Sequence, residues 1–177
     1  MKGYAIEMFF DVASELRLYS LWDEFARFGA ASMRDGEARP HVTLAVADSV
    51  DLPATHELLD SFARTAKPFS LSLASLGLFP CSERIVYLAP KATPELLALH
   101  GRFFDRFASV AGGIWQLYAP ATWVPHCTLA IGLLPQQLVP AVDACQAFGL
   151  PLACTVAEVA LVEFRPVKQL HAVPFAA

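Results

Sequence analysis

Residues 40–46 of the chain read PHVTLAV, and residues 125–131 read PHCTLAI. Five of the seven positions are identical in the two segments, and the last position is aliphatic in both. The segments lie 85 residues apart in a chain of 177 residues, so each half of the chain contains one copy. A repeat of this kind predicts two similar lobes related by a pseudo-twofold axis, each contributing one of the segments as a strand.

Each copy places an imidazole and a hydroxyl on the same face of its strand. Side chains alternate between the two faces of a β-strand, so His41, Thr43 and Ala45 are predicted to point one way, while the residues between them point into the core. The second copy repeats this arrangement with His126, Thr128 and Ala130. We expect the two strands to face each other across a cleft, with the small alanines leaving room for a ligand.

Two imidazoles and two hydroxyls suit phosphoryl transfer that needs no metal ion. Imidazole titrates near neutral pH, so one histidine can accept a proton from the attacking group while the other donates one to the leaving oxygen. In-line displacement places these two groups on opposite sides of phosphorus, which matches histidines on opposite lobes. The threonine hydroxyls can donate hydrogen bonds to the non-bridging oxygens as negative charge develops there.

The paired Pro-His-x-Thr-Leu segments resemble the motifs of the 2H phosphoesterase superfamily, which includes bacterial 2′–5′ RNA ligase-like proteins and cyclic phosphodiesterases. The resemblance extends over nearly the whole chain. It implies a bilobal α+β fold in which two antiparallel-rich sheets line a central cleft and the helices lie outside. It also implies His41 and His126 as catalytic acid and base, and Thr43 and Thr128 as phosphate-binding residues. The expected reaction is metal-independent hydrolysis of a 2′,3′-cyclic phosphate on a nucleotide or RNA end, without a cofactor.

Two other functions are compatible with the same residues. Reversible 2′–5′ RNA ligation would use a ribose 5′-hydroxyl in place of water as the attacking group, and the histidine pair serves both reactions. A module that binds nucleotides without turnover belongs to a different class, but it needs neither an acid nor a base. A metallohydrolase is disfavoured because the carboxylates near the motifs, such as Asp48, fall outside the His-x-Thr faces.

The composition indicates a single domain over residues 1–177. Apolar residues make up 55% of the chain and charged residues 17%, which is enough for a buried core.

The net charge is −4 and no basic tract is present, so we expect a nucleotide or RNA terminus as the partner, without an extended nucleic-acid surface. The four cysteines lack zinc-ligand spacing. The sequence has neither the pattern of a signal peptide nor that of a membrane span, so we expect a cytoplasmic monomer that does not bind a membrane.

The strand and helix patterns alternate and then pair into hairpins, which is typical of a layered α+β (α/β) domain. Predicted strands cover residues 4–10, 41–47, 69–79, 84–89, 126–133, 152–164 and 169–174. Predicted helices cover residues 11–29, 53–66, 93–110 and 135–148. Gly112 and Gly113 are expected to end the third helix, and residues 32–40 are expected to form a polar loop.

Three further groups of residues are candidates for secondary roles. The histidines without a partner motif, predicted to be structural or exposed, are His56, His100 and His171. The aromatic residues before the second motif suit base stacking or, in the favoured interpretation, packing between lobes; they are Trp115, Tyr118 and Trp123. The cations that could reach a phosphate, which the sequence does not rank, are Arg39, Arg84, Arg165 and Lys168.

Overall fold

Eight strands in the described part of the chain form one antiparallel sheet. The computed structural model describes residues 3–30 and 33–176, so Ser32 of the predicted polar loop lies outside the described residues. The strand order is β5-β2-β1-β7-β3-β4-β6, and β8 pairs with β7. The strands are β1 Gly3–Phe10, β2 His41–Val50, β3 Phe69–Phe79, β4 Ile85–Pro90, β5 Ala111–Ile114, β6 Cys127–Ala130, β7 Leu152–Phe164 and β8 Lys168–Pro174.

Strand β7 connects the two halves of the sheet because it is long enough to pair with different strands along its length. The part from Val156 to Phe164 pairs with β1, and the part from Leu152 to Val156 pairs with β3. Strand β8 pairs with β7 between Glu158 and Glu163. The predicted α+β class is confirmed, and the two predicted sheets are joined through β7 into one hydrogen-bonded path.

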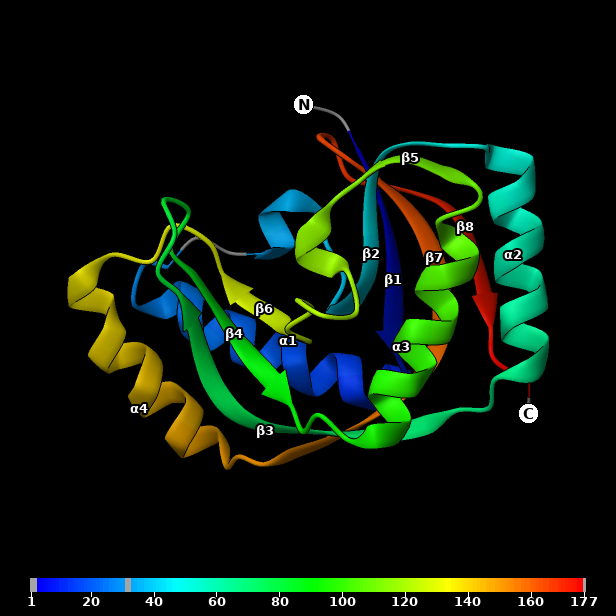
Figure 1. Ribbon diagram of the computed structural model, residues 1–177. Coiled ribbons are helices and arrows are strands. Elements are labelled where there is room, and N and C mark those ends of the chain that lie inside the picture. The colour runs from blue at the N-terminus through cyan, green and yellow to red at the C-terminus, as the bar shows by residue number, and fades with distance from the viewer. Residues whose placement is uncertain (1–2, 31–32, 177) are drawn as a thin grey trace.

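Four α-helices in the described residues cover the sheet in two pairs (Figure 1). They are α1 Val12–Arg27, α2 Leu52–Thr65, α3 Pro94–Phe107 and α4 Leu138–Phe148. Helices α2 and α3 contact each other, and they pack on β2, β7 and β8, whereas α1 contacts α4 and β6. The described residues also include the short 3₁₀ helices η1 Met33–Gly36, η2 Gln116–Tyr118 and η3 Pro135–Gln137.

The helix starts follow the capping residues in the sequence. The Asp11 carboxylate accepts a hydrogen bond from the backbone N–H of Ser14 at 2.8 Å, and α1 begins directly after Asp11. The Thr93 hydroxyl accepts one from the N–H of Leu96 at 3.2 Å, with proline in the first turn of α3. These caps set where each helix leaves the sheet.

The region between α3 and β2 differs from the prediction. Gly112 and Gly113 do not end α3; they lie in β5, which pairs with β2. At Gly113 φ is +65°, and a Cβ there would lie 2.4 Å from a carboxylate oxygen of Asp48. Glycine is therefore needed at this position because a side chain would be both strained and in collision with the neighbouring strand.

Several further boundaries differ as well, and β2 extends to Val50, beyond the predicted residue 47. Strand β6 ends at Ala130, earlier than predicted, because the chain turns at Gly132, where φ is +78°. The predicted helix over residues 135–148 begins as the 3₁₀ helix η3 before α4, and the predicted polar loop contains η1.

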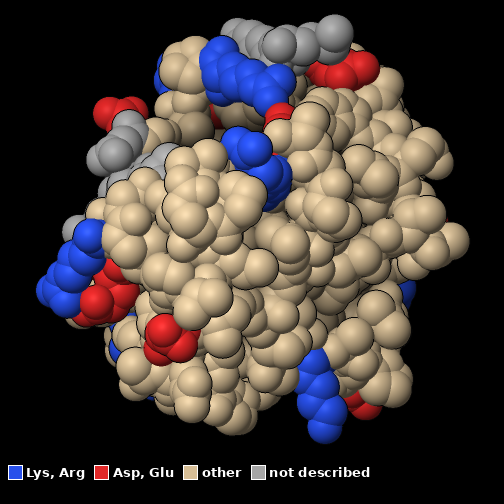
Figure 2. Space-filling model, turned by 90° about the vertical axis from the view of Figure 1, so that its left-hand side faces the viewer, with Lys and Arg blue, Asp and Glu red and all other residues tan. Residues whose placement is uncertain are grey.

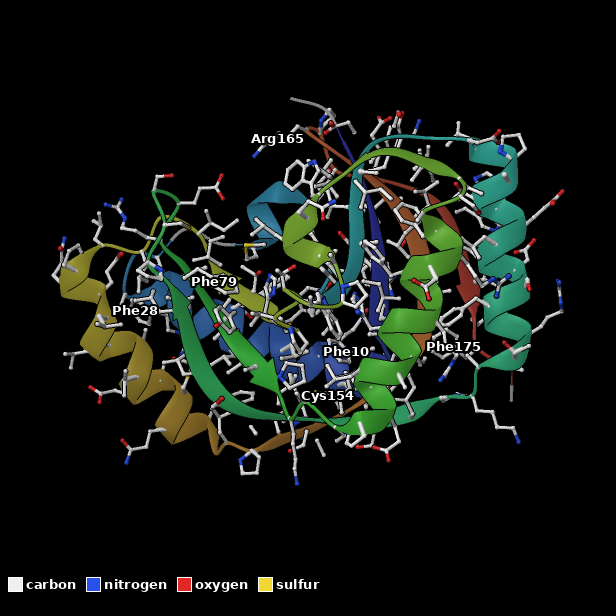
Figure 3. The ribbon with its side chains drawn as sticks, in the orientation of Figure 1. Phe10, Phe28, Phe79, Cys154, Arg165 and Phe175 are labelled. Atoms are coloured by element: carbon white, nitrogen blue, oxygen red, sulfur yellow. The ribbon has the colours of Figure 1, made fainter. Side chains whose placement is uncertain are left out.

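One large cluster of buried apolar side chains fills the space between the sheet and the helices. It includes Phe10, Cys154 and Phe175, which Figure 3 labels in the interior of the fold. Within residues 3–30 and 33–176, no helix is both long enough and apolar enough to cross a lipid bilayer.

Candidate functional site

A β-bulge follows the threonine of the first histidine strand. Between β1 and β2, Glu7 pairs with Thr43 while Ile6 pairs with Ala45, so Leu44 is an extra residue on β2. A bulge of this kind reverses the faces of the residues that follow it. Ala45 is consequently buried in the core, and the prediction that it leaves room in the cleft is wrong.

The second histidine strand has its bulge at the equivalent position. The ladder between β4 and β6 shifts register between Thr128 and Ala130, so Leu129 is the extra residue. Ala130 is also buried in the core, against the prediction. The residue after each alanine, Val46 or Ile131, lines the cavity in its place.

The four residues of the two motifs share one cavity of about 500 Å³, lined by His41, Thr43, His126 and Thr128. Strand β2 supplies the first pair, and β6 with the residue preceding it supplies the second. Other residues on this wall come from β1, the segment before β2, η2 with the residue preceding it, and the β7–β8 hairpin. They include Glu7, Phe9, Arg39, Trp115, Tyr118, Phe164, Arg165 and Lys168.

Both histidine rings are oriented by the same contact. The Nδ1 of His41 lies 2.6 Å from the carbonyl oxygen of Arg39, and the Nδ1 of His126 lies 2.7 Å from that of Val124. A carbonyl oxygen can only accept a hydrogen bond, so Nδ1 carries the proton in both rings. In the neutral form of each ring, Nε2 is then the nitrogen that can accept a proton.

Two tryptophans hold the backbones of the histidine strands at matching positions. The indole N–H of Trp123 donates to the carbonyl oxygen of Thr43 at 3.0 Å, and that of Trp22 donates to the carbonyl oxygen of Thr128 at 3.0 Å. These donors satisfy carbonyl groups next to the bulges, which would otherwise be costly to bury. Trp123 also stacks on the buried ring of His100 at 3.8 Å, so both residues pack the fold.

Arg39 is occupied by contacts within the protein. Its guanidinium donates to Glu15 at 2.8 and 3.1 Å, to Glu158 at 2.7 Å and to Gln169 at 2.9 Å. It also lies 4.0 Å from the centre of the Phe9 ring. Because Arg39 ties the segment before β2 to α1, β7 and β8, it fixes the carbonyl that orients the first histidine ring.

The remaining candidate cations differ in position. Arg165, in the turn between β7 and β8, and Lys168, the first residue of β8, line the cavity, whereas Arg84 is not among its lining residues. Figure 3 labels Arg165 on this turn and Phe79 on β3, in the other half of the sheet. The structure therefore distinguishes the cations that sequence patterns left unranked.

Charged groups are sparse on the face of the molecule in Figure 2, where they are scattered among residues of other kinds. In the part of the chain that the structure describes, no group of three or more His, Cys, Asp or Glu side chains is placed to hold a metal ion.

His56 and His171 lie outside the cavity. Their ring centres are 4.3 Å apart in a stacked arrangement, and the Nε2 of His171 lies 2.9 Å from a carboxylate oxygen of Asp60.

Glu7 is a cavity residue that the motif search missed. Its Oε1 lies 3.6 Å from the Nε2 of His41, and only 11% of the Glu7 side chain is exposed. Burial raises the pKa of the Glu7 carboxyl, while the nearby charges of His41 and Arg39 oppose that rise. The signal was present in the sequence, since Glu7 is the one charged residue within the strand pattern from Tyr4 to Phe10.

His126 lies in a different environment, among aromatic rings. The centre of its ring is 5.0 Å from that of Phe79 and 5.3 Å from that of Tyr87. Burial lowers the pKa of His126, the charge of His41 lowers it further, and the contact with Val124 opposes the change. The neutral imidazole of His126 is therefore favoured.

Tyr118 also lines this cavity. Burial raises the pKa of Tyr118 to about 12, with smaller contributions from the charges of Glu7 and Glu83. Its hydroxyl therefore keeps its proton near neutral pH and can act as a hydrogen-bond donor. Trp115, which also lines the cavity, donates its indole N–H to Asp48 at 2.9 Å.

The fold is similar to several solved structures that share 16% sequence identity with the chain. The LigT protein of E. coli in complex with 3′-AMP has a TM-score of 0.62, with 99% of this chain and 98% of that chain covered. The protein TT0787 of Thermus thermophilus has a TM-score of 0.63, with 99% and 98% covered. The protein ATU0111 of Agrobacterium tumefaciens, described as of unknown function, has a TM-score of 0.59, with 99% and 86% covered.

A comparison with curated protein sequences found no match. The family model described as the 2′-5′ RNA ligase superfamily matches residues 14–167, which include both His-x-Thr segments and most of the sheet. The chain therefore belongs to the 2′-5′ RNA ligase superfamily, a group of 2H phosphoesterases.

Proposed function

We propose that this protein is a metal-independent phosphoesterase that hydrolyses 2′,3′-cyclic phosphates on nucleotides or RNA ends, with His41 and His126 as the acid–base pair. The observation that carries the proposal is the arrangement of the pair. Both rings are fixed through Nδ1, and both line one cavity together with Thr43 and Thr128. A matched pair of this kind suits proton transfer on both sides of a phosphorus atom.

In the proposed reaction, one imidazole accepts a proton from water at Nε2 as the water oxygen attacks phosphorus. The bond from phosphorus to one ribose oxygen breaks, and that oxygen takes a proton from the Nε2 of the other imidazole. The hydroxyls of Thr43 and Thr128 donate hydrogen bonds to the non-bridging oxygens, where negative charge increases. The two histidines exchange their charge states in each turnover, and solvent restores them.

The size and lining of the site support a nucleotide as the substrate. A second hollow of about 610 Å³, lined mainly by apolar groups, adjoins the cavity and shares Trp115, Tyr118 and His126 with it. Aromatic rings there can stack on a base. The similar LigT protein has been crystallised with 3′-AMP, ATP and NADP+, and 3′-AMP is what forms when the bond to O2′ of a 2′,3′-cyclic phosphate is hydrolysed.

The description of the matching family favours a second candidate, reversible 2′–5′ ligation. In that reaction a ribose 5′-hydroxyl attacks the cyclic phosphate in place of water, and the same pair of histidines moves the protons. The adjoining hollow has room for the nucleoside that carries this hydroxyl. The two reactions differ in the acceptor, so they are separable by experiment.

The test is turnover of 2′,3′-cyclic AMP in the presence of a chelator, with products resolved as 2′-AMP and 3′-AMP. We expect hydrolysis at an undiminished rate, because the proposed chemistry uses only side chains. In a parallel reaction, an oligonucleotide with a 2′,3′-cyclic phosphate is mixed with a 5′-hydroxyl oligonucleotide. A joined product supports ligation, whereas nucleotide binding without any product in either reaction would contradict a catalytic role.

The activity is expected to fall on the acid side of its pH profile as the base becomes protonated. Because burial lowers the pKa of His126, its neutral form persists to lower pH than that of an exposed histidine. With His126 in the role of the base, the acid limb of kcat/KM should therefore have its midpoint below about 6.5, the ordinary pKa of histidine. Steady-state rates at constant ionic strength, measured from well below to well above neutral pH, locate this midpoint. A midpoint higher than the ordinary pKa of histidine would argue against His126 as the base.

A further inference from the structure

The two histidine strands are equivalent in most respects but differ in the residue beside each threonine. On the first strand, Glu7 is the cross-strand partner of Thr43. On the second strand, Tyr87 is the partner of Thr128. The bulges, the Nδ1 contacts and the tryptophan donors match in the two halves. A carboxylate on one side and a phenol on the other is therefore the main chemical asymmetry between the two imidazoles.

The geometry places the Glu7 carboxylate where it acts on Nε2 of His41. The 3.6 Å separation from Oε1 to Nε2 is short for two charges in a largely buried site, where 17% of the His41 side chain and 11% of the Glu7 side chain are exposed. The same separation is too long for a strong hydrogen bond. The carboxylate therefore lies close to the imidazole without a strong hydrogen bond to Nε2, and His41 still lines the cavity where a substrate oxygen would lie.

Burial raises the pKa of the Glu7 carboxyl, and the charges of His41 and Arg39 oppose that rise, so an imidazolium at His41 and a carboxylate at Glu7 stabilise each other. Arg39, whose charge also acts on Glu7, is already paired with Glu15 and Glu158. Tyr118, from η2, also interacts with Glu7, and it is neutral near pH 7 because its pKa is about 12. On the other side of the cavity, the ring of His126 contacts Phe79 and Tyr87, which offer no charge to an imidazolium.

We propose that Glu7 is a positioning residue that keeps His41 in its imidazolium form, which makes His41 the general acid and leaves His126 as the general base. This assignment rests on the proposed hydrolysis of cyclic phosphates. Water gives its proton to Nε2 of His126 as its oxygen bonds to phosphorus. The departing ribose oxygen takes the proton from Nε2 of His41, where the carboxylate of Glu7 balances the charge beforehand.

The test is the pH profile of Glu7→Gln, which removes the charge and keeps the shape. The alkaline limb of kcat/KM reports loss of the acid's proton, and we expect it to move to lower pH by about one unit, so the rate above that limb falls about tenfold. KM should not rise, because Glu7 repels the phosphate rather than binding it. Glu7→Asp keeps the charge and should leave the limb near its original position.

Two results would overturn the assignment. One is an unchanged alkaline limb in Glu7→Gln, and the other is a shift of the acid limb instead, which would mean that Glu7 acts on the base. The urea midpoints of both variants are measured first. If Glu7→Gln does not fold, Glu7→Ala replaces it, because it also removes the charge; an alkaline limb that does not move in folded Glu7→Ala overturns the assignment.

A measurement without substrate separates this inference from the proposed reaction. The ¹⁵N chemical shifts of the His41 ring at neutral pH report its imidazolium fraction. That fraction should fall in Glu7→Gln and persist in Glu7→Asp, whether or not the protein turns over a cyclic phosphate. If the fraction depends on Glu7 while no substrate is hydrolysed, the proposed function fails and the charge coupling stands. If the fraction is the same in all three proteins, the coupling fails.

Discussion

Alanine in place of His126 or His41 is expected to lower kcat for 2′,3′-cyclic AMP by about 10²–10⁴-fold in each variant, because each loses one proton transfer in the transition state. KM should change far less, since the threonines and the cavity wall remain in place. If the two rings act in the same step, the double variant will be less impaired than the product of the single effects. Steady-state kinetics with purified variants measures all three.

The chain offers matched controls for these variants. His56 and His171 stack on each other away from the cavity, between α2 and β8. His56→Ala and His171→Ala should therefore keep kcat within about twofold, because neither side chain lines the cavity. Full activity in His126→Ala or His41→Ala, with a normal urea midpoint, would refute the two-histidine mechanism.

Trp22→Ala is expected to destabilise the fold by about 3–5 kcal/mol, which is a large part of the stability of a typical domain. Trp22 is 1% exposed, its ring meets that of Tyr19 edge-to-face at 5.4 Å, and its indole N–H satisfies the carbonyl of Thr128. Removing the ring leaves a cavity beneath β6 and an unpaired carbonyl. The thermal midpoint should drop by roughly 6–20 °C for a domain of this size.

Two further variants separate the contributions of Trp22. Leu16→Ala changes a residue on the same helix that is 60% exposed, and it should alter the free energy of unfolding by less than about 0.5 kcal/mol. Trp22→Phe keeps one aromatic ring and loses the N–H together with part of the buried ring volume, so its cost should lie between those of Leu16→Ala and Trp22→Ala. Urea unfolding followed by circular dichroism measures each change. A Trp22→Ala protein as stable as Leu16→Ala would show that this contact does not support β6.

Local patterns were sufficient for most of the secondary structure. The helix that begins after Asp11 and the helix that begins at Pro94 each follow a capping side chain, and such a cap is a contact between residues three apart in the chain. The prediction that Gly112 and Gly113 end α3 was wrong, because both lie in β5. A glycine pair ends a helix or enters a strand depending on what lies beside it, and here Asp48 of β2 lies beside Gly113.

In the site, too, some features could be predicted from local sequence and others depend on contacts between distant segments. His41 and His126 were identified by their repeated context, which needs no knowledge of the fold. The faces of Ala45 and Ala130 were predicted wrongly because strict alternation holds only in a regular strand, and each strand contains one extra residue. Pairing with a distant strand defines a bulge, so the register could not be read from either segment alone.

The amino-acid sequence by itself determined the family, the α+β class and the two imidazole–hydroxyl pairs, because each depends on residues close together in the chain or repeated along it. The tertiary structure decided which groups surround each imidazole. Glu7 reaches His41 through the pairing of β1 with β2, and Phe79 and Tyr87 reach His126 from β3 and β4. These contacts join residues that are distant in the chain, and the charge state of a histidine depends on what lies within a few ångströms of it.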